Sequence, residues 1–113
     1  MRARRAACEC VGTALLLATV VGSGIMGERL SGGSVGLALL ANSVATGAVL
    51  AALILALGPV SGAHLNPLVS IAAGWHRDVS DVPGFALAQV AGAAAAVAFA
   101  HWLATARAVR AEG

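Results

Sequence analysis

The residues best suited to chemistry lie in one short run between apolar segments. Positions 61–67 read Ser-Gly-Ala-His-Leu-Asn-Pro, and an apolar stretch follows up to Trp75. Asn66 and Pro67 stand in the order expected of a helix N-cap and a first helical residue. A helix from Pro67 to Trp75 would be about 13 Å long, too short to cross a hydrocarbon core of about 30 Å. We therefore predict a re-entrant half-helix that begins inside a bilayer.

This placement would give the run an electrostatic role. A helix that begins at the bilayer midplane directs about half a positive charge towards the centre. With the side-chain amide of Asn66 as a donor, it would orient a neutral polar solute and oppose cations and protons. Residues 59–65 would be non-helical backbone, which a membrane protein tolerates where it is buried or lines a wet cavity, and Gly62 would allow a tight path. The alternative is a shallow interfacial helix that only caps the protein.

The composition is that of a membrane protein. Of 113 residues, 59% are hydrophobic and 11% charged, whereas soluble domains carry roughly a quarter charged residues. Three apolar segments, at about 6–26, 35–57 and 84–106, are each long enough to span a bilayer. The first is too long for a cleavable signal peptide and contains Glu9. We expect an all-α membrane protein with three transmembrane helices and one re-entrant half-helix, the re-entrant loop and half-helix together at about 59–75, forming a single domain over residues 1–113.

Charges and breakers set the expected topology. Arg2, Arg4 and Arg5 favour a cytoplasmic N-terminus in a multi-pass protein of the bacterial inner membrane. The second helix is expected to stop at Gly58-Pro59, and a polar turn is expected at 76–78.

Small residues recur at every fourth position of two expected helices. They are Ser43, Gly47 and Ala51 in the second helix, and Ala88, Gly92, Ala96 and Ala100 in the third. This spacing is typical of closely packed membrane helices, although the abundance of alanine and glycine could also produce it.

Several functions are excluded. The basic residues are seven scattered arginines, which argues against a nucleic-acid partner. No nucleophile with a base and no metal-ligand cluster is apparent, so we expect no enzyme activity, no cofactor and no metal site.

Four separated sites carry a resemblance to a known family. The run at 61–67 resembles the first Asn-Pro-Ala loop of the aquaporin and glycerol-facilitator family, the major intrinsic proteins. Residues 9–13, Glu-Cys-Val-Gly-Thr, resemble the family's Glu-x-x-Gly-Thr in the first helix. Gly47 matches a small residue of the second helix, and residues 88–93 resemble Ala-Gln-x-x-Gly-Ala of the third.

The resemblance implies a role for each matching residue. Asn66 would be the pore-lining amide and Pro67 the start of the half-helix, while His64 and Gly62 would shape the descending loop. Glu9 and Gln89 would hydrogen-bond the loop backbone, in keeping with the need of intramembrane charges for a partner. Gly12, Gly47 and Gly92 would be helix-packing positions. For Glu9, an ion pair with Arg5 at i, i+4 spacing is the alternative.

Two departures from the family pattern bear on selectivity. Leu68 stands where the family usually carries Ala, adding bulk where two half-helices should meet. By the same resemblance, Thr46 stands at the position of the family's outer filter. Water-selective members carry Phe at that position, and glycerol facilitators tend to carry Trp. Because Thr46 is smaller and more polar, the constriction would be wider. Thr at this position is similar to that of bacterial members associated with arsenic resistance.

The resemblance covers only the first of two inverted repeats, so the single domain over residues 1–113 is expected to be one aquaporin-like half domain. We therefore expect an aquaporin-like channel protein, truncated or split, for passive passage of water, glycerol or metalloid hydroxides. Its expected partners are the lipid bilayer, a small neutral solute, and either further copies of itself or a complementary half-channel. The alternatives are a non-conducting membrane fragment and, with less support, a dimer like the small multidrug exporters. Those exporters share the length and a first-helix Glu, but they need four full spans.

Overall fold

The computed structural model describes residues 2–76 and 79–112, and in these two ranges all regular structure is helical. The elements are α1 (Arg2–Leu30), α2 (Val35–Ser61), α3 (Pro67–His76), the 3-10 turn η1 (Val79–Asp81) and α4 (Val82–Glu112). The predicted all-α class is confirmed. The centre of the expected polar turn, Arg77 and Asp78, lies outside the described residues.

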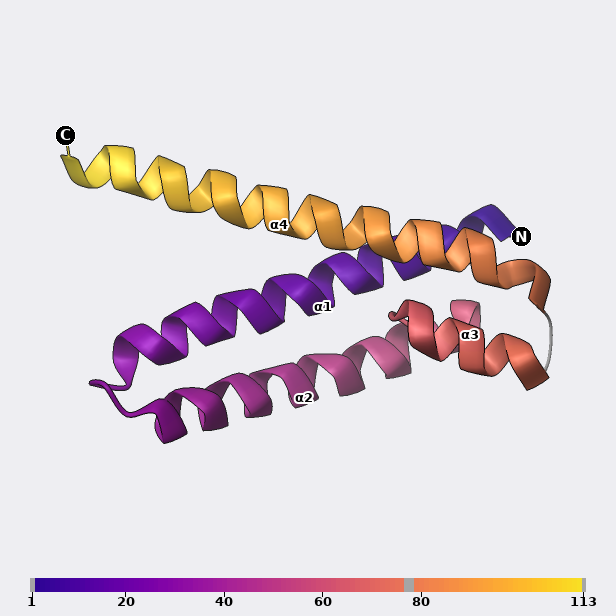
Figure 1. Ribbon diagram of the computed structural model, residues 1–113, viewed down its shortest axis with the longest axis horizontal. Helices are drawn as coiled ribbons and strands as arrows, with labels where there is room; N and C mark the ends of the chain where they lie inside the picture. The colour runs from indigo at the N-terminus through magenta and orange to yellow at the C-terminus, as the bar shows by residue number, and fades with distance from the viewer. Residues whose placement is uncertain (1, 77–78, 113) are drawn as a thin grey trace.

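The three long helices are long and apolar enough to cross a membrane. α1 packs along both α2 and α4, whereas the short α3 packs against α4. Figure 1 shows α1 and α4 running in the same direction, with α2 antiparallel to both and α3 beside the C-terminal end of α2. α1 is thus the helix on which the others assemble.

The predicted end of the second helix is wrong. α2 does not stop at Gly58-Pro59 but continues to Ser61. A proline this close to a C-terminus costs the helix one hydrogen bond and does not end it. The end comes at Gly62, whose φ of 89° is left-handed and whose N–H donates to the carbonyl of Gly58 at 2.9 Å. A glycine in this conformation is a common helix C-cap.

The segment between α2 and α3, residues 62–66, is therefore shorter than the expected 59–65 loop and strongly bent. Ala63 and Leu65, with φ of 49° and 58°, share the left-handed region with Gly62. Each such residue other than glycine costs roughly 1–2 kcal/mol. Both are buried, so neighbouring groups must hold the backbone in this shape.

Two of the predicted packing glycines lie at close contacts of α1. A Cβ added to Gly12 would lie 2.5 Å from Leu65 Cδ2, and one added to Gly92 would collide with the backbone carbonyl of Cys10. Gly92 therefore brings α4 onto the backbone of α1, as small residues do between membrane helices. The packing role predicted for Gly47 is not found within the described chain, because a Cβ added there would meet nothing within 4 Å.

We expect Gly92→Ala to destabilise the protein by about 1–3 kcal/mol, the usual cost of overpacking, since a backbone carbonyl cannot rotate out of the way as a side chain can. Thermal unfolding in detergent, followed by circular dichroism, measures the effect. Gly47→Ala is the matched control and should unfold like the parent. Equal midpoints for the parent and both variants would contradict the close contact at Gly92.

Candidate functional site

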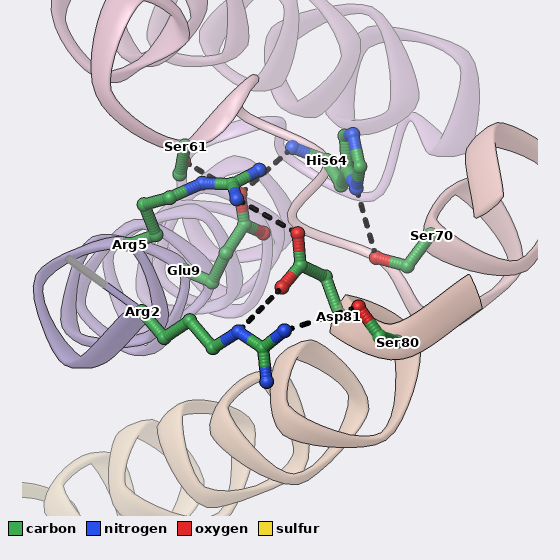
Figure 2. Close-up of polar contacts among 8 residues, drawn as sticks. All are labelled: Arg2, Arg5, Glu9, Ser61, His64, Ser70, Ser80 and Asp81. Atoms are coloured by element: carbon green, nitrogen blue, oxygen red, sulfur yellow. Dashed lines mark hydrogen bonds and ion pairs between the residues drawn. The ribbon is translucent and has the colours of Figure 1, made fainter. Parts of the chain in front are cut away.

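The carboxylate of Glu9 is fully buried and accepts four hydrogen bonds. Its Oε1 accepts from Ser61 Oγ at 2.7 Å and from the N–H of His64 at 3.0 Å. Its Oε2 accepts from the N–H of Leu65 at 2.7 Å and from Gln89 Nε2 at 2.9 Å. Both oxygens thus face donors only, which suits an ionised carboxylate. Figure 2 shows Glu9 with Ser61 at the end of α2 and His64 of the loop. With Gln89 of α4, three helices and the loop meet at this one group.

Two serines extend these contacts. Ser70 Oγ on α3 accepts from Gln89 Nε2 at 2.9 Å and lies 3.1 Å from His64 Nδ1. Ser61 Oγ also accepts from the N–H of Ala63 at 3.2 Å. We call Glu9, Ser61, His64, Ser70 and Gln89 the loop cluster. Sequence reasoning missed both serines, although Ser61 begins the motif and Ser70 carries the hydroxyl of an otherwise apolar half-helix.

The alternative pairing of Glu9 with Arg5 is wrong. Arg5 Nη1 contacts Asp81 Oδ2 at 2.7 Å, and its guanidinium lies over the ring of Phe85, 5.2 Å from the centroid. Arg2 Nε lies 3.8 Å from the second oxygen of Asp81, and Figure 2 shows both arginines converging on that carboxylate. These contacts join the start of α1 to the start of α4. This pairing could not be predicted from the sequence, because the residues are far apart along the chain.

Asn66 caps α3. Its Oδ1 accepts from the N–H of Leu68 at 2.8 Å, and its backbone carbonyl accepts from the N–H of Ser70 at 3.1 Å, with Pro67 as the first helical residue. Because Oδ1 faces α3, the amide NH₂ faces away from it. The side chain is exposed, and within residues 2–76 and 79–112 this NH₂ has no hydrogen-bond partner. It is a donor at the N-terminal end of a helix.

The loop supplies the matching acceptors. The N–H groups of His64 and Leu65 both point at Glu9. In a trans peptide the N–H and the preceding C=O point in opposite directions, and no peptide of the described chain is cis. The carbonyls of Ala63 and His64 therefore point away from Glu9. The loop thus has two carbonyl acceptors that face away from the carboxylate, next in sequence to the amide donor of Asn66.

The two predicted selectivity residues lie outside the loop cluster. Thr46 on α2 donates its hydroxyl proton to Asn42 Oδ1 at 3.1 Å, and Asn42 Nδ2 donates to the carbonyl of Val20 at 3.4 Å. Leu68, in the first turn of α3, is 74% exposed. In the part of the chain that the structure describes, no hydrogen bond joins the Thr46 hydroxyl to the loop cluster, and the aliphatic side chain of Leu68 can form none.

Among the described side chains, no three of His, Cys, Asp and Glu come together as a metal site would require. The loop cluster holds a single carboxylate that is already saturated by donors.

Comparisons with known proteins match most of this chain. The family model described as "Major intrinsic protein" matches residues 1–112. The chain is 50% identical over 100 residues to "Aquaglyceroporin AqpS" of Rhizobium meliloti (strain 1021), covering 87% of this chain and 42% of that protein. It is 41% identical over 90 residues to "Probable aquaporin NIP7-1" of Arabidopsis thaliana, covering 78% of this chain and 32% of that protein.

A third relative is "Aquaporin Z" of Rhodopseudomonas palustris (strain ATCC BAA-98 / CGA009), 34% identical over 99 residues, which cover 86% of this chain and 40% of that protein. The chain thus spans less than half the length of these relatives. No solved structure matches it significantly.

We expect Glu9→Gln to loosen the loop, because an amide NH₂ would face N–H or O–H donors on one side of the site. Each unsatisfied buried donor costs about 1–3 kcal/mol. Hydrogen exchange of the His64 and Leu65 amides, followed by mass spectrometry in detergent, should become faster. Glu28→Gln is the control, since Glu28 is an exposed carboxylate on the same helix. Unchanged exchange in Glu9→Gln would contradict the bonding described above.

Proposed function

This chain belongs to the major intrinsic protein family, and we propose that it builds one half of a transmembrane channel for small neutral polar solutes. Members of this family are membrane channels and not enzymes. The family match therefore argues against the alternative of a dimer like the small multidrug exporters. The observation that carries the proposal is the loop at 62–66, in which two backbone carbonyls point away from Glu9 and the exposed Asn66 amide NH₂ faces away from α3.

The proposed mechanism is an exchange of hydrogen bonds. A neutral solute such as water, glycerol or a metalloid hydroxide both donates and accepts. It would donate to the carbonyls of Ala63 and His64 and accept from the Asn66 NH₂ while it sheds its own water. The positive end of α3 would oppose a cation at the same place. The negative charge of Glu9 would not cancel this repulsion of cations by α3, because four hydrogen-bond donors enclose the carboxylate.

We propose a half-channel because the described chain leaves residues at the start of α3 uncovered. Asn66 and Leu68 are both exposed there, and pores of this kind are closed by a second, inverted repeat. The partner would be a complementary half or a second copy of this chain in the opposite orientation. A fragment that conducts nothing remains the competing proposal.

Selectivity is proposed to favour solutes larger than water. Thr46 is smaller than Phe or Trp, and its hydroxyl proton is engaged by Asn42, so it would offer lone pairs to a passing solute. The bulk of Leu68 would act at the junction with the second half-helix.

The chain is a membrane protein, and three helices of spanning length lie in the part that the structure describes. We propose a cytoplasmic N-terminus, supported by Arg2, Arg4 and Arg5. We also propose a bacterial inner membrane, supported by the 50% identity to a protein of Rhizobium meliloti. Three crossings would then place the end of α4 on the opposite side.

Asn66→Asp tests the channel mechanism. Asp keeps the oxygen that caps α3, so the half-helix should persist, but it replaces the NH₂ donor with a negative charge. We expect glycerol flux into proteoliposomes, measured by light scattering, to fall at least about tenfold, the equivalent of one lost hydrogen bond to a charged or well-placed group.

The flux experiment uses the chain alone and the chain reconstituted with the part of AqpS that lies beyond the matched region. Glu28→Gln serves as the control variant, since its change lies at an exposed site outside the loop. Flux only in the paired sample supports a half-channel. No flux in either sample, or equal flux with Asn66→Asp, would contradict the proposed function.

Thr46→Phe tests the filter. A larger side chain at this position should reduce glycerol flux several-fold more than water flux, because a narrower constriction excludes the wider solute first. Stopped-flow measurements of both solutes on the same vesicles give the ratio. Thr19→Phe, another threonine substitution on a helix, is the control. A water-to-glycerol ratio unchanged by Thr46→Phe would show that the residue does not line the passage.

A further inference from the structure

α1 and α4 enclose a groove of about 550 Å³ on the side of the molecule away from the loop cluster. The two helices touch at Gly92 and Cys10 and then separate towards their C-terminal ends, as Figure 1 shows. Two helices that cross in contact at one level must diverge beyond it. Small side chains, among them Ala18 and Gly22, and larger apolar ones, such as Phe99 and Leu103, line the space.

The apolar part of the groove is about as long as one bilayer leaflet. The lining runs from Ala18 to Arg29 on α1 and from Ala96 to Ala111 on α4, with Arg107 one turn before its end. From Ala18 to Arg29, and likewise from Ala96 to Arg107, the helix rises by about 16 Å, close to half of a hydrocarbon core of about 30 Å. The apolar part therefore ends at the depth where lipid headgroups begin.

Two arginines line the groove at its headgroup end. Arg29 and Arg107 are exposed and line the same groove from opposite helices. Among the side chains that the structure describes, neither has a carboxylate partner, whereas Arg2 and Arg5 both contact Asp81. Guanidinium groups bind phosphate through paired hydrogen bonds.

We propose that this groove binds one anionic phospholipid, with an acyl chain between α1 and α4 and the phosphate on Arg29 and Arg107. A zwitterionic lipid would fill the apolar part equally well, but its positive headgroup would lie beside the two arginines. A protein segment would fit less well, because it would have to supply acidic groups at this one end. The site lies apart from the loop and does not depend on conduction.

Native mass spectrometry of the detergent-solubilised chain tests the proposal. Phosphatidylglycerol and phosphatidylcholine with identical acyl chains are titrated separately, and the bound fractions are compared. We expect phosphatidylglycerol to bind roughly tenfold more tightly, the equivalent of one charge-assisted hydrogen bond. The double variant Arg29→Gln/Arg107→Gln should bring the ratio close to one. Arg4→Gln/Arg110→Gln removes the same total charge outside the groove lining and should keep the preference.

A second pair of variants tests the apolar part. Gly22 lines the groove and a Cβ there would meet nothing within 4 Å, so Gly22→Leu should fill the space without disturbing the fold and reduce binding of both lipids several-fold. Gly36 is equally unobstructed but lies on α2, outside the groove, so Gly36→Leu should bind lipid like the parent.

Three results would overturn the proposal. They are equal binding of the two lipids to the parent chain, equal loss of preference in both arginine double variants, and unchanged lipid binding in Gly22→Leu. A stable dimer that takes up no lipid would also overturn it, since a second copy would then cover the groove.

Discussion

The burial of one carboxylate is the constraint on which the rest of this structure depends. Glu9 has no contact with water, so its charge must be met by hydrogen-bond donors within the protein. Two of those donors are backbone N–H groups of the loop at 62–66. The loop presents them with left-handed conformations at Ala63 and Leu65. The local strain is therefore offset by the hydrogen bonds to the carboxylate, and the same geometry directs the loop carbonyls outwards.

The position of Glu9 on α1 explains why α1 contacts both of the other long helices. Gly12, one turn further along, admits Leu65 against the helix, while Gly92 lets α4 approach closely enough for Gln89 to reach the carboxylate. The ion pairs of Arg2 and Arg5 with Asp81 hold the two helices together at one end. Their separation at the other end, and the groove that results, follows from the same close crossing.

Much of this could be predicted from the sequence, but unevenly. The half-helix and its start at Pro67 followed from an Asn-Pro pair before an apolar stretch too short to span a bilayer. Glu9 and Gln89 were expected from a family resemblance to hydrogen-bond the loop backbone. Glu9 does so, whereas Gln89 donates to the side chains of Glu9 and Ser70 and to no loop backbone group among the described residues, so that part of the expectation was wrong. Ser61 and Ser70 were missed, because a serine in an apolar helix gives no sign of which face it occupies. The stop at Gly58-Pro59 was wrong, because dipeptide preferences are weaker than a tertiary contact such as that of Ser61 with Glu9.

The sequence by itself determined the class of this protein. Long uncharged segments must be helical in a bilayer, since every backbone group needs a partner within its own segment. It also placed the cap of the half-helix, which depends on neighbouring residues alone. Only the tertiary structure decided which donors meet Glu9, which glycines pack against a neighbour and which do not, and where Arg5 finds its partner. Those contacts join residues more than fifty positions apart, and such distances in space are set by helix crossing rather than by local preference.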